Sequence, residues 1–351
     1  MLADEVSVVV GVDTHAETHA LALVEARTQR TTRTLVVPAS RAGYRRALRL
    51  ARREAPAARV WALEGSGSYG AGLARFLSER GERVLEVERP ARTQTGQKRR
   101  LKSDLLDAER AARQVLAGTA GATPRLAPQT QALRALMVAR EGAVVACTQA
   151  LNELRSLVVT APAELRERLQ GDPERQLLQA CLRLRSGSSG SERAALALAL
   201  RSLALRVRQL RHEAQTLEKE LARRVGQLAP GLLAQPGVGP ITAAALLIGW
   251  SHPGRLRSEA CYARLAGVAP IPASSGKTIR HRLDRGGDRR LNRALHTIVL
   301  TRRRIDPTTR AYIQRRLSEG KTEREAVRCL KRYLARSLYR LLEHEVILDT
   351  A

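Results

Sequence analysis

Length, composition and charge exclude several classes of protein. The chain has 351 residues, more than one small hydrophobic core can organise, so two or three domains are expected. Lysine and arginine total 61 against 34 aspartates and glutamates, a net charge of +27 that would repel itself without a polyanionic partner. No apolar run is long enough to span a bilayer, so nucleic acid is favoured over a membrane.

The cysteines and the start of the chain favour a cytoplasmic protein. The four cysteines match no metal-binding spacing and are expected to be reduced thiols. Asp4 and Glu5 stand where a secretory signal would carry basic residues. The cysteines are Cys147, Cys181, Cys261 and Cys329.

The first 120 residues alternate between strand and helix patterns. A β-branched run at 6–13 predicts a buried central strand that ends in Asp13. Two strands follow at hairpin distances, which predicts an antiparallel meander, and the full order β-β-β-α-β-α-β-α is that of a ribonuclease-H-like domain. The later elements are predicted as strands at 19–24 and 32–37, a helix at 41–54, a strand at 59–64, a helix at 69–80, a strand at 84–87 and a helix opening at Asp104.

Four carboxylates occupy positions that suggest a site for divalent metal. Asp104 and Asp107 share a face at the start of the last helix, for which Ser103 is the predicted N-cap. Asp13 and Glu64 stand at the ends of strand-like runs. Carboxylate oxygens bind Mg²⁺, and such a site suits phosphodiester cleavage because metal stabilises the entering and leaving oxygens. The alternative for the helix pair is that acids in a first turn complement the helix dipole.

His15 and His19 have the four-residue spacing of a helical zinc pair. The segment falls in a turn between predicted strands, so a zinc pair is not favoured. Both side chains are instead expected to be surface histidines near phosphate.

A polar, basic loop at 89–100 separates the last strand from the acidic helix. We expect its cations, together with the lysine that follows, to hold a nucleic-acid backbone beside the carboxylates. An ordinary solvated loop is the alternative. The cations assigned to this role are Arg92, Lys98, Arg99, Arg100 and Lys102.

The middle of the chain is predicted to be helical. A stretch rich in Gly, Ala, Thr and Pro at 118–128 marks a boundary, and residues 129–226 follow a heptad-like pattern. A Gly-Ser stretch at 186–191 is expected to break this region into a hairpin of two long helices. We expect these helices to dimerise and to flank nucleic acid, and an intramolecular hairpin is the alternative.

The third region opens with Pro-Gly-Val-Gly-Pro at 236–240, a turn typical of helix-hairpin-helix modules. The backbone N–H groups of Gly237 and Gly239 are predicted to reach a phosphate. The alternative is a plain turn between two helices.

A serine pair, Ser274 and Ser275, precedes Gly-Lys-Thr at 276–278. A phosphate loop would need glycine where the chain has Ile271, so no nucleotide site is expected. A serine here is a candidate nucleophile toward phosphate, with cations stabilising the developing charge, and a turn of small residues is the alternative. The cations are Lys277, Arg280, Arg282, Arg285, Arg289 and Arg290.

Taken in order, the motifs resemble the DEDD transposases of insertion sequences, the bridge-RNA-guided recombinases of the IS-one-ten (IS110) class. The resemblance covers nearly the whole chain and implies a fold that is α/β plus all-α. It implies a RuvC-like domain of the ribonuclease H fold at 1–120, a helical coiled-coil dimerisation region at 121–227 and a helical transposase domain at 228–351. The matching stretches are Val-Gly-Val-Asp-Thr, Leu-Glu-Gly-Ser-Gly-Ser-Tyr, Lys-Ser-Asp-x-x-Asp-Ala, Pro-Gly-Val-Gly-Pro, Ala-Gly-Val-Ala-Pro, Ser-Ser-Gly-Lys and Arg-Gly-Gly-Asp-Arg-Arg-Leu.

The resemblance also implies roles and partners. Ser275 would form a phosphoserine link to DNA, with Ser274 as the alternative nucleophile. A bridge RNA would select donor and target DNA, and a bacterial, nucleoid-associated homotetramer, a dimer of dimers, would bring the acids of one subunit to the serine of another. The implied ligands for Mg²⁺ or Mn²⁺ are Asp13, Glu64, Asp104 and Asp107.

The sequence therefore predicts a metal-dependent, RNA-guided DNA recombinase. Two alternatives remain: a RuvC-like nuclease that hydrolyses branched DNA with water, and a non-catalytic scaffold that uses its basic surface alone. Aromatic residues make up only 3% of the chain, so backbone contacts are expected to dominate over base stacking.

Overall fold

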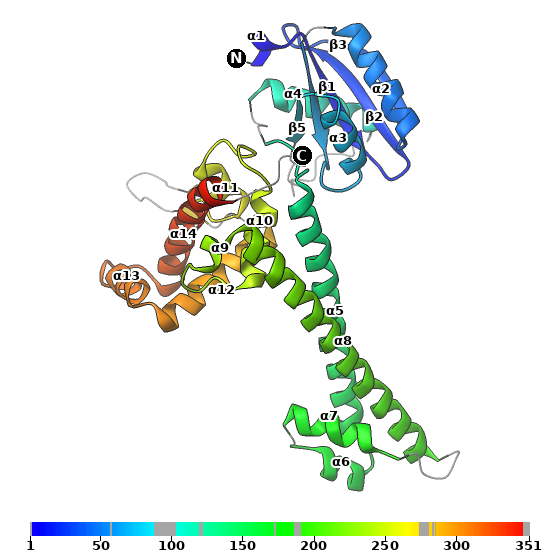
Figure 1. The fold of residues 1–351 in the computed structure, drawn as a ribbon, viewed down its shortest axis with the longest axis vertical. Coiled ribbons are helices and arrows are strands. Elements are labelled where there is room, and N and C mark those ends of the chain that lie inside the picture. The colour runs from blue at the N-terminus through cyan, green and yellow to red at the C-terminus, as the bar shows by residue number, and fades with distance from the viewer. Residues whose placement is uncertain are drawn as a thin grey trace. The chain divides into compact units, whose positions relative to one another are not determined.

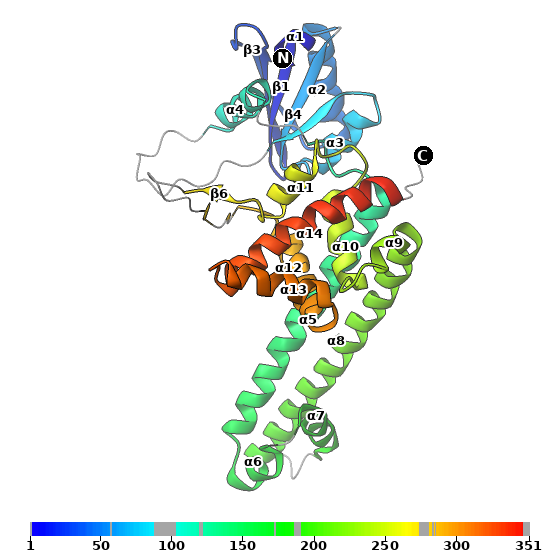
Figure 2. The ribbon, with the colours of Figure 1, turned by 90° about the vertical axis from the view of Figure 1, so that its left-hand side faces the viewer.

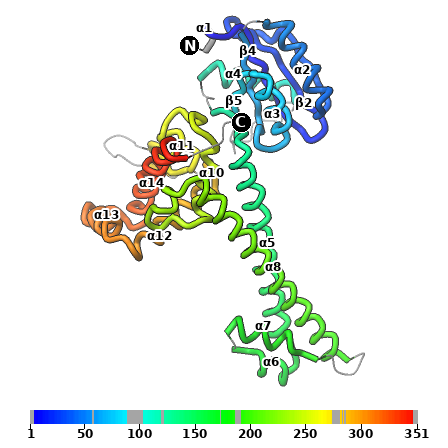
Figure 3. The backbone as a smooth tube through the Cα atoms, in the orientation of Figure 1, coloured from blue at the N-terminus to red at the C-terminus, as the bar shows by residue number. Residues whose placement is uncertain are grey.

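The computed structural model describes residues 2–56, 58–87, 103–118, 122–171, 173–185, 191–273, 281–282, 284 and 286–346. The chain divides into two compact units. Unit 1 comprises Met1–Gln131, Gln235–Gly237 and Leu246–Ala351, and unit 2 comprises Ala132–Ala234 and Val238–Ala245. Figure 1 labels the elements along the chain, and Figure 3 traces the same path as a tube.

Unit 1 begins with a five-stranded sheet in the order β3-β2-β1-β4-β5. The pairs β1–β2 and β2–β3 are antiparallel, whereas β1–β4 and β4–β5 are parallel. The predicted meander and the order of the elements after it are confirmed, and the arrangement fits a ribonuclease-H-like fold. The strands are β1 (Val8–Thr14), β2 (Thr18–Glu25), β3 (Thr31–Pro38), β4 (Arg59–Glu64) and β5 (Val84–Val87), and the helices are α1 (Leu2–Glu5), which was not predicted, α2 (Arg41–Glu54), α3 (Ala71–Ser78) and α4 (Asp104–Leu116).

The central strand β1 is buried on both faces, since all seven of its residues are buried. Val8, Val10 and Val12 share a core with residues of α2 and α3, whereas Val9 belongs to a second core with residues of α4. This alternation follows from the two-residue period of a strand. Figure 2 accordingly shows α2 and α4 on opposite sides of β1. Burial on both faces explains why this strand is a continuous apolar run.

Gly11 allows α4 to lie directly against β1. A Cβ atom at this position would stand 1.9 Å from the carbonyl oxygen of Ala108 and 2.9 Å from the backbone nitrogen of Ala112. The facing side of α4 is built from small residues, with Ala108, Ala111 and Ala112 all buried. The glycine and the alanines together set how closely the helix backbone approaches the strand.

Replacing Gly11 with alanine is expected to destabilise unit 1 by about 3 kcal/mol, because the new methyl group collides with backbone atoms that no rotamer change can move. Gly67→Ala is the control, since a Cβ there meets nothing within 4 Å. Urea unfolding followed by circular dichroism measures both variants. Equal stability of the two would contradict the close approach of α4 to β1.

A buried acid before β5 ties three elements together. The Glu82 side chain is only 3% exposed. It accepts hydrogen bonds from Arg59 of β4 at 2.6 and 2.7 Å, from Nη2 of Arg52 in α2 at 3.0 Å and from the indole N–H of Trp61 at 3.0 Å. Burial by itself would raise the pKa of Glu82, but these hydrogen bonds outweigh it and lower the pKa. The charged carboxylate is therefore the form that the fold stabilises.

Glu82→Gln is expected to cost about 2 kcal/mol of unfolding free energy at neutral pH, since it removes hydrogen bonds to a charged group. A lowered folded-state pKa contributes stability above the usual value of 4.5, and that stability is lost as pH falls through the folded pKa. The difference between wild type and variant should therefore shrink as the pH drops below 4.5. Urea unfolding at neutral and acidic pH checks this, and a pH-independent difference would refute it.

Unit 2 is built on two long helices, α5 (Pro128–Val159), whose first turn belongs to unit 1, and α8 (Glu192–Leu228). Two short helices lie between them in sequence, α6 (Ala163–Leu169) and α7 (Glu174–Arg183), and all four share a core that includes Leu154, Leu177 and Leu200. The predicted position of the break, at the Gly-Ser stretch, is wrong for the first long helix. This helix ends at Val159, shortly before Pro162, because a proline disfavours helix in the residue before it. Residues 186–190 lie outside the described residues.

The long helices therefore share an intramolecular core at the end of unit 2 that holds α6 and α7. Arg140 of α5 also donates to Glu218 of α8 at 2.9 Å. The intramolecular hairpin is present, and self-association through the same helices stays a prediction.

The C-terminal part of unit 1 is mostly helical, as predicted. The indole N–H of Trp250 donates to Glu343 at 2.6 Å, and the Tyr339 hydroxyl donates to the carbonyl of Leu256 at 2.8 Å. A two-stranded ribbon, which was not predicted, interrupts the helices. The elements from 230 onward, of which α9 and the first half of α10 belong to unit 2, are α9 (Pro230–Leu233), α10 (Pro240–Trp250), α11 (Glu259–Leu265), β6 (Ile271–Pro272), β7 (His281–Arg282), α12 (Arg289–Ile305), α13 (Pro307–Ser318) and α14 (Glu323–Glu345).

A buried arginine links the sheet to this helical part within unit 1. Arg255 is 2% exposed and donates to the Glu86 carboxylate of β5 at 2.8 Å and to the carbonyl of Gly249 at 3.1 Å. Burial lowers the pKa of Arg255, but a guanidinium does not lose its proton in a protein. The Glu86 carboxylate is therefore the counter-charge that this burial requires.

Candidate metal centre

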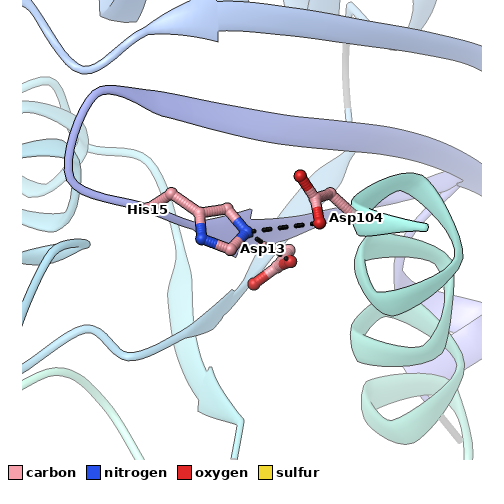
Figure 4. A group of neighbouring side chains, drawn as sticks. All are labelled: Asp13, His15 and Asp104. Atoms are coloured by element: carbon pink, nitrogen blue, oxygen red, sulfur yellow. Dashed lines mark hydrogen bonds and ion pairs between the residues drawn. The ribbon is translucent and has the colours of Figure 1, made fainter. Parts of the chain in front are cut away.

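The end of β1 and the start of α4 bring two carboxylates and an imidazole together. Asp13 is the last residue but one of β1, Asp104 is the first residue of α4, and His15 follows β1 directly. His15 Nε2 lies 3.1 Å from Oδ2 of Asp13 and 3.5 Å from Oδ1 of Asp104 (Figure 4). One ligand atom from each of the three residues lies within 4.8 Å of the others. Among the described residues this is a group that can hold a metal ion.

The two carboxylates differ in their access to solvent. The Asp13 side chain is 10% exposed, whereas the side chains of His15 and Asp104 are 49% and 63% exposed. The buried member is fixed by the central strand, and the exposed members leave the group open to a substrate. The donor set fits a divalent cation, because carboxylate oxygens suit Mg²⁺ and Mn²⁺ and the imidazole nitrogen adds a ligand that transition metals accept.

The other two predicted acids stand nearby in the fold but outside this group. Glu64 ends β4, which runs parallel to β1 with Val12 opposite Leu63, and Thr14 Oγ1 donates to the Glu64 carbonyl at 2.8 Å. Asp107 lies one helical turn after Asp104 and forms an ion pair with Arg110. The structure thus brings together two of the four acids, and metal binding by Glu64 and Asp107 stays a prediction.

His15 is the site residue that sequence reasoning missed. Its spacing to His19 is that of a helical zinc pair, whereas its spacing to Asp13 is the informative one. Residues two apart along an extended segment point to the same side, so a histidine two positions after a strand-end aspartate is placed to face it.

The prediction of a surface position is wrong for His19. This side chain is fully buried within β2, a strand paired on both edges, and its ring stacks on Tyr44 at a centroid distance of 5.6 Å. Burial lowers the pKa of His19. His19 is therefore a core residue of the sheet.

Ser103 occupies the predicted N-cap position of α4, but its side chain makes no capping hydrogen bond. The first-turn acids Asp104 and Asp107 are both present and can complement the helix dipole. The dipole interpretation therefore accompanies the metal interpretation rather than replacing it.

Most of the predicted nucleophile and phosphate contacts fall outside the described residues. This holds for both serines and for the cations of the two basic segments. The residues concerned are Arg92, Lys98, Arg99, Arg100, Lys102, Ser274, Ser275, Lys277, Arg280 and Arg285.

The described phosphate-contact candidates have local structural roles as well. Gly237 has φ +75° and packs against α12, where an added Cβ would lie 2.9 Å from the Ile298 carbonyl oxygen. The N–H of Gly239 donates to Thr242 Oγ1 at 2.9 Å, so it already has a partner. The arginine candidates in this part of the chain lie in β7 (Arg282) and at the start of α12 (Arg289 and Arg290).

Two family models match the chain. One, described as a transposase and specific to DEDD transposases of IS110, matches residues 10–161, and the other, described as the Transposase IS116/IS110/IS902 family, matches residues 230–314. The chain belongs to the IS110 family of DEDD transposases. The first match contains Asp13, His15 and Asp104, so the group seen in the structure lies inside the family's DEDD region.

Two curated relatives of this IS110-family chain are proteins of insertion elements. It is 36% identical over 116 residues to the IS110 uncharacterized 43.6 kDa protein of Streptomyces coelicolor, a match that covers 33% of this chain and 29% of the relative. It is 35% identical over 124 residues to the IS900 uncharacterized 42 kDa protein of Mycobacterium paratuberculosis, covering 34% and 31%. The matched segments thus span about a third of each protein.

None of the described helices in this IS110-family chain combines the length and apolar character needed to cross a membrane.

Asp104→Asn is expected to weaken binding of Mn²⁺ by at least about tenfold, since it removes one carboxylate from the group around His15. Glu109→Gln is the matched control, because Glu109 lies on the same helix and pairs with Arg113. Isothermal titration calorimetry with Mn²⁺ measures both. Equal affinity of the two variants would remove Asp104 from the metal site.

Proposed function

We propose that this chain is a bridge-RNA-guided DNA recombinase that cleaves and rejoins donor and target DNA through a phosphoserine intermediate. The observation that carries the proposal is the Asp13–His15–Asp104 group at the end of the central strand. The family and the net charge of +27 support a DNA substrate, and the same charge supports a second polyanion, the guide RNA.

Asp13 and Asp104 would hold a divalent cation, Mg²⁺ or Mn²⁺, and Glu64 and Asp107 are proposed to complete its ligands. When bound, such a cation stabilises the negative charge that develops on phosphate oxygens during cleavage. Asp13 is fixed by burial in β1, and Nε2 of His15 lies 3.1 Å from its carboxylate.

Ser275 is proposed as the nucleophile, with Ser274 as the alternative. The serine Oγ forms a bond to phosphorus while the bond from phosphorus to the oxygen of the departing strand end breaks, and the proton lost by the serine is balanced by one that this oxygen gains from solvent. Attack by the hydroxyl of a new strand end reverses the step, rejoins DNA and frees the serine. Arg282, Arg289 and Arg290 are proposed to neutralise the phosphate.

Strand exchange requires several active sites in one assembly, and we propose a homotetramer built as a dimer of dimers. Unit 2 supports association, because apolar side chains stay exposed on its long helices. Val145 is 67% exposed on α5 and Leu198 is 64% exposed on α8. In such an assembly the acids of one subunit can serve the serine of another.

The decisive experiment traps wild type on a nicked DNA substrate with guide RNA and divalent cation. A denaturation-resistant protein–DNA adduct is expected, whose modified peptide contains Ser275. Ser275→Ala should reduce the adduct at least about a thousandfold while DNA binding is kept, because removal of a nucleophile removes the covalent step and not the phosphate contacts. Asp104→Asn should also lose the adduct, whereas Glu109→Gln should keep it.

Each other outcome has a distinct meaning. An adduct on Ser274 moves the nucleophile by one residue and keeps the mechanism. Robust cleavage by Ser274→Ala combined with Ser275→Ala means that water attacks, and the hydrolytic nuclease replaces the recombinase. Binding without metal-dependent cleavage by wild type leaves only the nucleic-acid scaffold.

A further inference from the structure

A second candidate site lies in the C-terminal part of unit 1, apart from the acidic group. It is a cleft of about 650 Å³. One wall is formed by the segment Gly267 to Pro270 and by β7, and the other by residues of α13, α14 and the turn between these helices. None of the described residues that line it is Phe, Tyr or Trp.

The cleft is strongly cationic. Two acids also line it, but each accepts hydrogen bonds from its own turn: Asp284 from the N–H of Gly286 at 2.8 Å, and Glu325 from the N–H of Thr322 at 2.9 Å. Of the cations, Arg282, Lys321, Arg328 and Arg332 form no salt bridge with another described residue. The six lining cations are Arg282, Arg316, Lys321, Arg328, Lys331 and Arg332.

One of these cations is buried. Lys331 of α14 is 7% exposed, and its Nζ donates to Oδ1 of Asn292 at 2.6 Å. Asn292 is itself held in place, because its amide donates to the carbonyl of Ala266 at 2.7 Å. Within the described part of the chain, Lys331 thus has an amide partner and no carboxylate. A buried ammonium without counter-charge is costly, and an anion in the cleft would supply that charge.

The pKa shifts of two groups at this wall also favour an anion in the cleft. Burial lowers the pKa of Lys331, and both burial and the charge of Lys331 lower the pKa of the neighbouring His296. A positive field at this wall favours a negatively charged ligand.

We propose that this cleft holds a backbone phosphodiester of the DNA strand that is cut. Arginines and lysines together are suited to phosphate, through the planar guanidinium fork and the compact ammonium charge. The described residues of the lining include no aromatic side chain, which favours contact with the backbone over stacking on bases. The assignment to the cut strand rests on the proposed function, whereas phosphate binding does not.

Covalent geometry relates the cleft to the proposed nucleophile. His281 and Arg282 of β7 line the cleft, and Ser275 precedes His281 by six residues. Six residues span at most about 20 Å even when fully extended. That distance corresponds to about six base-pair steps along the axis of a duplex, so a strand seated in the cleft has phosphates within reach of the serine.

The test uses full-length protein with a metal chelator, so that binding is measured without cleavage. Arg328→Gln combined with Arg332→Gln changes two exposed lining residues of α14, which protects the fold. Affinity for a short single-stranded DNA should fall at least about tenfold, and the slope of log K against log salt should drop by about 1.4. The matched control, Arg324→Gln with Arg315→Gln, removes the same charge from exposed positions outside the lining and should change affinity little.

One cysteine reports directly on the cleft, and a second cysteine of the same chain is its control. Cys329 lines it, whereas Cys261 is exposed outside the lining. Single-stranded DNA should slow alkylation of Cys329 by N-ethylmaleimide at least about fivefold and leave Cys261 unchanged, and mass spectrometry of the two peptides measures both rates. Duplex DNA and RNA of the same length are the comparison ligands.

The outcomes separate the cleft from the proposed function. Protection of Cys329 by DNA in a protein that forms no serine adduct keeps the cleft as a DNA site and rejects the recombinase. Protection by RNA alone assigns the cleft to RNA and overturns the cut-strand proposal. Equal alkylation with every ligand, or equal affinity of the two double variants, removes the site altogether.

Discussion

The close approach of α4 to β1 is the contact on which the candidate metal centre depends. It exists because Gly11 has no side chain and because Ala108 and Ala112 present backbone to the strand. Asp104 lies one helical turn before Ala108, on the same face of α4. A larger residue at the contact would lift the helix and carry that carboxylate away from Asp13. Packing of small residues in the core thus controls polar geometry at the edge of the sheet.

Acids in unit 1 fall into two kinds according to their partners. Glu82 and Glu86 are paired with arginines in the interior, where the fold needs their charge. Asp13 and Asp104 have His15 between them and no arginine partner among the described residues. The interior carboxylates Glu82 and Glu86 neutralise guanidinium groups that the fold has buried, whereas Asp13 and Asp104 can offer their charge to a cation.

The basic residues of unit 1 also fall into two groups, those in interior ion pairs and those that line the cleft. Arg59 and Arg255 form interior ion pairs. The cations of the cleft beside α14 have two acids near them, and each of these acids accepts a hydrogen bond from its own turn. Part of the excess of basic residues in the composition therefore lies at this cleft. Unit 2 contributes differently: α6 and α7 complete a core with the long helices, and the apolar side chains left outside that core are available for association.

The sequence by itself determined the order of the five strands and of helices α2 to α4 in the first 120 residues, because alternation and periodicity are local properties of the backbone. It also placed Asp13 at a strand end and Asp104 at a helix start. Only the tertiary structure decided which of these groups meet: it joined His15 to the two acids, buried His19 against Tyr44, and assembled a cleft from segments between Gly267 and Arg332. Contacts of this kind depend on how closely helices and strands pack against one another, and the pattern of residues along the sequence does not give the distance between packed elements.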